Sequence, residues 1–121
     1  PAGTGKTETT KDLGRALAAN RPLVYAAGHE HSLQLYRDGA RAEYLIVSGA
    51  GAAGHVNTVT TLPNTLFAHA HPGFVSLDFE RMPSGTVSVI ARVVESGLGE
   101  VYATRLAGEE GNSSATAAPG R

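Results

Sequence analysis

The spacing of apolar residues along this chain changes from helical to alternating near residue 22. Leu13, Ala16 and Leu17 recur three or four positions apart, and threonine and acidic residues cluster ahead of them. Because an α-helix repeats every 3.6 residues, this spacing predicts a helix over residues 7–19. The string Asn20-Arg21-Pro22 supplies the signal that ends it.

Seven short segments after this helix have the composition of β-strands. They are apolar runs or stretches of alternating apolar and polar residues, and they cover residues 23–27, 32–36, 44–48, 65–70, 73–79, 86–94 and 100–106. The turn Arg37-Asp38-Gly39 predicts that the second and third segments pair as a hairpin. Strands without intervening helices favour antiparallel pairing. The sequence therefore predicts an α+β fold with one N-terminal helix and a β-rich remainder.

Composition narrows the class of protein. A chain of 121 residues forms one domain at most, and 41% apolar with 17% charged residues is typical of a globular core. The net charge of −1 gives no electrostatic case for a nucleic-acid partner, because proteins that bind nucleic acids usually have a clustered basic face. No membrane span and no signal peptide are visible, and the absence of cysteine leaves the compartment open. We expect a helical segment over residues 1–20, a β-domain over 21–107 and a disordered tail over 108–121.

The string Gly28-His29-Glu30-His31 carries the clearest candidate chemistry. It follows an apolar strand directly, and active-site groups often lie where a strand opens into a loop. Two histidines two positions apart can turn their rings to one point or bracket two metal ions, and imidazole is the commonest nitrogen ligand of zinc, iron and manganese. Such a pair can equally be two solvated or hydrogen-bonded histidines, so the spacing alone leaves both interpretations open.

With its flanking residues, this string resembles the last signature block of calcineurin-like metallophosphoesterases. The similarity runs from Pro22-Leu23-Val24-Tyr25 through the histidines to Ser32-Leu33-Gln34, and more loosely over residues 21–95. In that family a strand ends in Gly-His-x-His, and each histidine ligates one of two metal ions. The resemblance implies that His29 and His31 ligate Mn, Zn or Fe. It also implies that the chain is the β-rich C-terminal part of an α/β four-layer sandwich.

The activity implied by the resemblance is hydrolysis of phosphoesters by a hydroxide that two metal ions activate. The family takes its remaining ligands from Asp-x-His, Gly-Asp-x-x-Asp and Gly-Asn-His-Glu/Asp blocks, none of which occurs in this sequence. Two histidines are too few to hold two such ions. Because the first residue is Pro1 and it falls inside a motif, we expect a fragment that is inactive alone and acts in a longer parent or with a partner.

That motif supports an alternative function. The opening string PAGTGKT matches a phosphate-binding loop apart from its first glycine, and residues 1–18 resemble the first ATP-binding loop of dynein motor domains. In such loops backbone N–H groups cradle phosphates, so Gly3, Gly5, Lys6 and Thr7 would hold ATP and Mg²⁺. The only candidate for the acidic Walker-B residue is Asp78. The alternative is therefore a nucleotide-binding fragment of a dynein-like AAA+ ATPase.

The remaining histidines carry weaker signals. His69 and His71 are two positions apart at a strand end, so their rings share one face and could form a second metal pair, although histidines at strand ends are commonly solvated. His55 is expected to face solvent, and Glu30 to face solvent or to form a hydrogen bond that supports the neighbouring histidines. A third, non-enzymatic interpretation is a truncated β-domain that self-associates through uncovered sheet edges.

Overall fold

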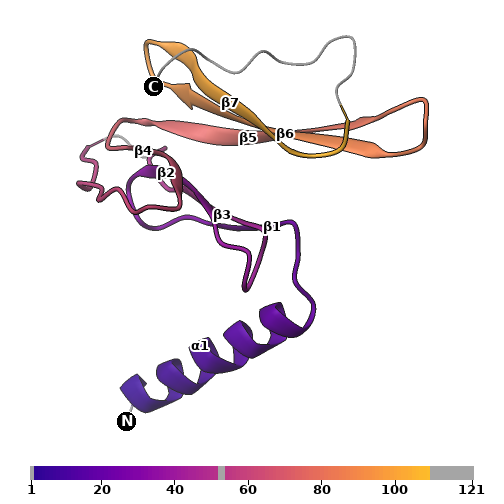
Figure 1. Cartoon of the computed structure of the whole chain (residues 1–121). Coiled ribbons are helices and arrows are strands. Elements are labelled where there is room, and N and C mark those ends of the chain that lie inside the picture. Colours follow the sequence, from indigo (N-terminus) through magenta and orange to yellow (C-terminus); the bar gives the residue numbers. More distant parts are fainter. Residues whose placement is uncertain (1, 52–53, 110–121) are drawn as a thin grey trace.

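The structure is a computed structural model that describes the backbone of residues 2–51 and 54–109, and the side chains from residue 8 onward. Within these residues it contains one helix and seven strands: α1 (Ala2–Ala19), β1 (Val24–Ala27), β2 (Leu33–Arg37), β3 (Tyr44–Ser48), β4 (Thr65–His69), β5 (Gly73–Arg81), β6 (Val87–Glu95) and β7 (Gly99–Ala107). Figure 1 shows the helix standing apart from two β-sheets. The chain therefore has the small, β-rich α+β fold that the sequence predicts.

The strands form two sheets. One has four strands in the order β1-β3-β2-β4, and the other has three in the order β5-β6-β7. β2 and β3 pair antiparallel across the turn at Asp38, which confirms the predicted hairpin. β1 and β3 pair in parallel, so the expectation of antiparallel pairing is wrong for these two strands. The reason is that the chain reverses direction twice between them, and β3 then inserts between β1 and β2.

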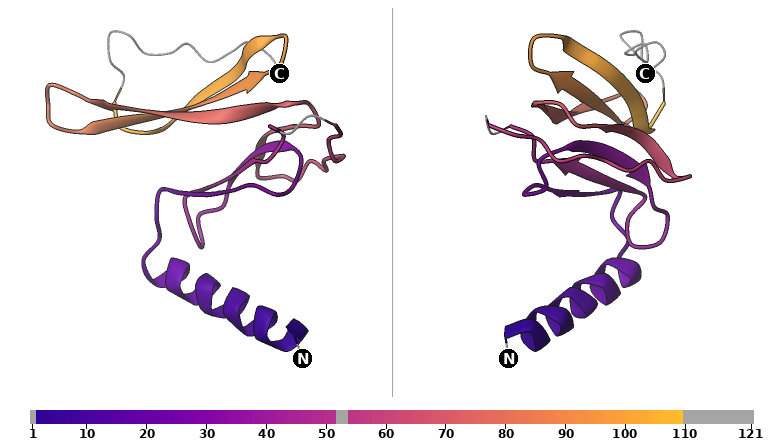
Figure 2. Two further views of the ribbon diagram at one scale, coloured as in Figure 1. Left: turned by 180° about the vertical axis from the view of Figure 1, so that it is seen from behind. Right: turned by 90° about the vertical axis from the view of Figure 1, so that its left-hand side faces the viewer.

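The core lies between the inner faces of the two sheets, which pack against each other in both views of Figure 2. The Ser48 hydroxyl links them by accepting a hydrogen bond of 2.9 Å from the backbone nitrogen of Val75. Alternate residues of each strand face this core, as expected for strands with one buried face. The buried side chains are mainly aliphatic and include Leu33, Leu35, Ile46, Phe67, Val89, Ala91 and Val93.

α1 is largely exposed, in contrast to the sheets. Over residues 8–19 only Gly14 and Leu17 are partly covered. The helix begins at Ala2, before its predicted start, whereas the strand boundaries agree with the predicted ones to within two residues. Of the tail predicted to be disordered, residues 110–121 lie outside the described part of the chain.

Candidate functional site

The sheet topology gathers the histidines at one end of the molecule. The carboxyl ends of β1 and β3 lie side by side because these strands are parallel. The amino end of β2 pairs with both the end of β3 and the end of β4, through Leu33. All the histidines of the chain lie at these strand ends or in the loops that follow them, on the left in Figure 1: His29, His31, His55, His69 and His71. We call this region the histidine end.

His29 has an unusual backbone conformation. It is the second residue after β1, its side chain is exposed, and its φ angle is 75°. It is the only residue other than glycine with a positive φ in the described part of the chain. This left-handed conformation costs about 1–2 kcal/mol for a residue with a Cβ atom, although histidine adopts it more often than most residues. The surrounding structure must therefore hold His29 in place.

Two residues hold the loop that carries His29 and His31. A Cβ atom at Gly49 would overlap the carbonyl oxygen of Glu30 and lie 2.8 Å from its carbonyl carbon, so only glycine lets the end of β3 approach this loop. On the other side, the Asn57 side-chain oxygen accepts a hydrogen bond of 2.8 Å from the His31 nitrogen. The Asn57 backbone nitrogen donates one of 2.7 Å to the His31 carbonyl. The loop is thus held by the end of β3 on one side and by Asn57 on the other.

The ring of His31 has a neighbour that the sequence did not reveal. His31 is half-buried, and its ring centroid lies 4.8 Å from that of His55, with the two planes tilted by 53°. His55 is exposed, as expected. Glu30 is exposed too. The pKa of the Tyr36 phenol is raised, first by the burial of Tyr36 and then by the negative charge of Glu30.

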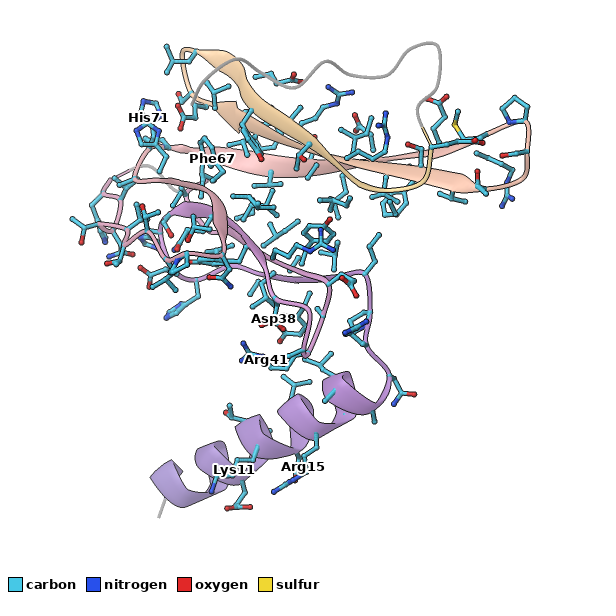
Figure 3. The ribbon with its side chains drawn as sticks, viewed as in Figure 1. Lys11, Arg15, Asp38, Arg41, Phe67 and His71 are labelled. Atoms are coloured by element: carbon cyan, nitrogen blue, oxygen red, sulfur yellow. The ribbon has the colours of Figure 1, made fainter. Side chains whose placement is uncertain are left out.

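A second group of titratable side chains at the histidine end surrounds Glu95, the last residue of β6. Its carboxylate is fully buried, and its Oε2 atom forms a hydrogen bond with Nδ1 of His69. His71, labelled in Figure 3, places its Nδ1 atom 4.0 Å from Oε1 of Glu95. The two histidine rings stack with their centroids 5.7 Å apart and their planes at 18°. His69 and His71 therefore share a face, as the sequence predicts, but they do so around a buried carboxylate.

Sequence reasoning missed Glu95, although the pattern contained a signal. Val89, Ala91 and Val93 face the core, and Glu95 continues this series at the same spacing. The predicted strand stopped one residue short of it. Because glutamate is almost never fully buried unless it is paired, a glutamate at a core-facing position points to a partner elsewhere in the chain.

A pocket of about 390 Å³ opens beside Glu95. Gly73 shapes it, because a Cβ atom there would overlap the Val94 carbonyl oxygen and lie 3.0 Å from Cα of Glu95. The Ser96 nitrogen also donates a hydrogen bond of 2.8 Å to the Pro72 carbonyl. These contacts fix the segment that follows His71 against the end of β6. The pocket is lined by Ala50, Gly51, Pro72, Gly73, Phe74, Val94, Glu95 and Ser96.

The N-terminal motif lies in a different part of the fold. Gly3, Gly5, Lys6 and Thr7 are in helical backbone, so the loop conformation that the motif predicts is not the one in the structure. The candidate Walker-B residue Asp78 is on β5, in the sheet that lies away from α1 in Figure 1. Asp78 is paired with Arg92, which also contacts Glu100 at 2.9 Å. It belongs to a surface ion-pair network and does not accompany the motif.

Within residues 2–51 and 54–109, no group of three or more histidine, aspartate or glutamate side chains is arranged to hold a metal ion. The helix in this part of the chain is not both long and apolar enough to cross a membrane. Comparison with protein family models, curated proteins and solved structures gave no match.

Proposed function

We propose that this chain supplies two metal ligands, His29 and His31, to a metal-dependent phosphoesterase site. The observation that carries the proposal is the left-handed backbone of His29 directly after β1. An exposed side chain contributes little to the core, yet Gly49 and Asn57 hold this loop in a strained form. Backbone strain of this kind clusters at sites where a side chain is presented to a ligand.

The donor atoms suit part of such a site. Imidazole nitrogens are accepted by Zn, Fe and Mn ions, and the clamped backbone of His31 limits the positions that its ring can take. When two such ions are bound, they polarise phosphoryl oxygens and activate a water molecule. The described residues offer no carboxylate cluster beside His29 and His31. The oxygen ligands would have to come from outside the described residues, and the part played here is to position two nitrogen ligands.

The proposal also assigns the two sheets to the inner β-layers of an α/β four-layer sandwich. Their inner faces share one core, which fits two adjacent β-layers. α1 lies on the side of the four-stranded sheet in both views of Figure 2, where an outer helical layer would lie. The helices that would cover the rest of both outer faces would also have to come from outside the described part of the chain.

The two alternative functions make different predictions. A nucleotide-binding fragment would bind ATP–Mg²⁺ in a way that depends on Lys6. A self-associating β-domain would form oligomers through an uncovered edge. The edge strand β5, which carries the exposed side chains Phe74 and Phe79, favours this second alternative over the first.

Calorimetric titration of the whole chain with Mn²⁺ tests the proposal. We expect the His29→Ala/His31→Ala variant to lose Mn²⁺ binding. The matched control is His69→Ala/His71→Ala, which also removes two histidine side chains from the histidine end and should keep Mn²⁺ binding. Unchanged Mn²⁺ binding in the first variant would refute the proposal. ATP–Mg²⁺ titration of the chain and of Lys6→Ala, together with its size in solution, tests the alternatives.

A further inference from the structure

The buried carboxylate of Glu95 has a hydrogen-bond partner at only one of its two oxygens among the described residues. A buried carboxylate is costly unless it is both paired and hydrogen-bonded. Oε2 has His69 as its partner, whereas Oε1 has no hydrogen-bond partner among the described residues and lies 4.0 Å from Nδ1 of His71. Neutral imidazoles can donate hydrogen bonds but bring no positive charge. With both histidines neutral, the cluster keeps a net negative charge that a nearby cation would offset.

The orientation of the two rings points to the kind of cation. His69 directs Nδ1 to the Glu95 carboxylate, and His71 directs Nδ1 to the Pro72 carbonyl at 3.0 Å. A neutral ring that donates from Nδ1 keeps its Nε2 lone pair free on the other side of the ring. The two side chains are 50% and 32% exposed, so solvent reaches them. Histidines that bind metals are held in this way, by a carboxylate or a backbone carbonyl on the second nitrogen.

We infer that His69 and His71 form a second cation site, which takes an imidazole-preferring metal ion such as Zn²⁺ or Ni²⁺ through their Nε2 atoms. Glu95 is the positioning residue: it orients the His69 ring and supplies a charge opposite to that of the ion without touching it. Water completes the coordination. Mg²⁺ and Ca²⁺ are excluded because they prefer oxygen ligands.

The geometry requires a small adjustment of the rings. Two nitrogens on one tetrahedral zinc ion lie about 3.4 Å apart, from bond lengths of about 2.0–2.1 Å. The stacked rings have centroids 5.7 Å apart, so their Nε2 edges must tilt toward each other. Both side chains are partly exposed, and rotation about their side-chain bonds provides this movement while Nδ1 remains beside its partner.

This site is separate from the one formed by His29 and His31. His69 pairs with Leu33 at the end of β4, so both histidine pairs lie at the histidine end. Their partners differ, because the ring of His31 contacts His55 whereas His69 and His71 surround Glu95. The inference of a second site therefore does not depend on the phosphoesterase proposal.

Nitrogen-detected NMR of the ¹⁵N-labelled chain tests the inference, because it resolves Nδ1 and Nε2 of each histidine. Before metal is added, we expect His69 and His71 to be protonated at Nδ1. Zn²⁺ should shift their Nε2 signals, and Mg²⁺ should leave them unchanged. Protonation at Nε2 instead, or Zn²⁺ shifts that avoid both rings, would overturn the inference on the unaltered chain.

Variants add a quantitative test of Glu95. The Glu95→Gln substitution keeps the shape of the side chain and removes its charge, and loss of such a supporting carboxylate lowers metal affinity about 10–100-fold. The His69→Ala/His71→Ala variant should lose the Zn²⁺ event altogether, whereas His29→Ala/His31→Ala should keep the Zn²⁺ shifts at His69 and His71. Unchanged Zn²⁺ affinity in Glu95→Gln would remove its positioning role. If His29→Ala/His31→Ala abolished the Zn²⁺ shifts at His69 and His71, the two sites could not be separate.

Discussion

Replacing Leu35 by alanine tests whether the core lies between the two sheets. Leu35 is 0% exposed on the interior strand β2, between Ile46 of β3 and Phe67 of β4. The substitution removes three carbons, worth about 0.8 kcal/mol each on burial, or about 2.4 kcal/mol in total. Paired strands cannot collapse into the gap, so a cavity term is added. We therefore expect the free energy of unfolding to fall by about 3–4 kcal/mol.

The matched control is Leu98→Ala, which removes the same atoms at a position that is 58% exposed in the turn between β6 and β7. Less than half of the transfer free energy is at stake there, so we expect a loss of about 1 kcal/mol or less. Urea denaturation followed by far-ultraviolet circular dichroism measures both free energies, with similar slopes if only stability has changed. Equal losses for the two variants would show that the inner face of β2 is not the core.

Two further predictions concern loops. His29→Gly should be up to about 1 kcal/mol more stable than His29→Ala in the same denaturation assay, because glycine removes the left-handed strain; equal stability would mean that His29 is not strained. The Asp38→Ala substitution should lower the free energy of unfolding by roughly 1–2 kcal/mol at pH 7. The reason is that hydrogen bonds from the Arg41 side chain, and then from the backbone of Arg41 and Ala42, hold the pKa of Asp38 well below its usual value. This contribution is complete above the unfolded pKa near 3.8 and fades as pH falls toward the lower folded pKa. The free energies of unfolding of the original chain and of the variant should therefore become equal in acid. A stability difference that grows in acid would contradict this role of Asp38.

The strands could be predicted because the alternation of apolar and polar residues within each strand indicates which of its faces is buried. β6 alternates Val89, Ala91 and Val93 with residues on the opposite face, and this local pattern needs no knowledge of the partner strand. The parallel pairing of β1 with β3 could not be predicted in this way, since it depends on where the β2–β3 hairpin docks. The start of α1 shows a related limit: a motif specifies residue types, whereas the backbone they adopt depends on what packs around them.

The candidate site likewise has features that local sequence predicts and contacts that it does not. His29 and His31 stand out because two histidines and a glycine lie within one short string. The contact between His31 and His55 depends on the path of the loop that ends at Asn57. The burial of Glu95 depends on β6 ending beside the end of β4, in the other sheet. Contacts between residues far apart in sequence leave no mark in local spacing beyond a charge at a core-facing position.

The two histidine pairs differ in what holds them, and this difference predicts the order in which they bind zinc. His29 and His31 are fixed through their backbone, and no carboxylate among the described residues forms an ion pair or a hydrogen bond with their rings. His69 and His71 have Nδ1 atoms directed to Glu95 and to a backbone carbonyl, so their rings lose less freedom when an ion binds. Zn²⁺ added stepwise to the whole chain should therefore saturate the NMR shifts of His69 and His71 first. If His29 and His31 saturate first, ring orientation by Glu95 does not determine affinity, and the backbone strain at His29 prepares a better site than the buried carboxylate does.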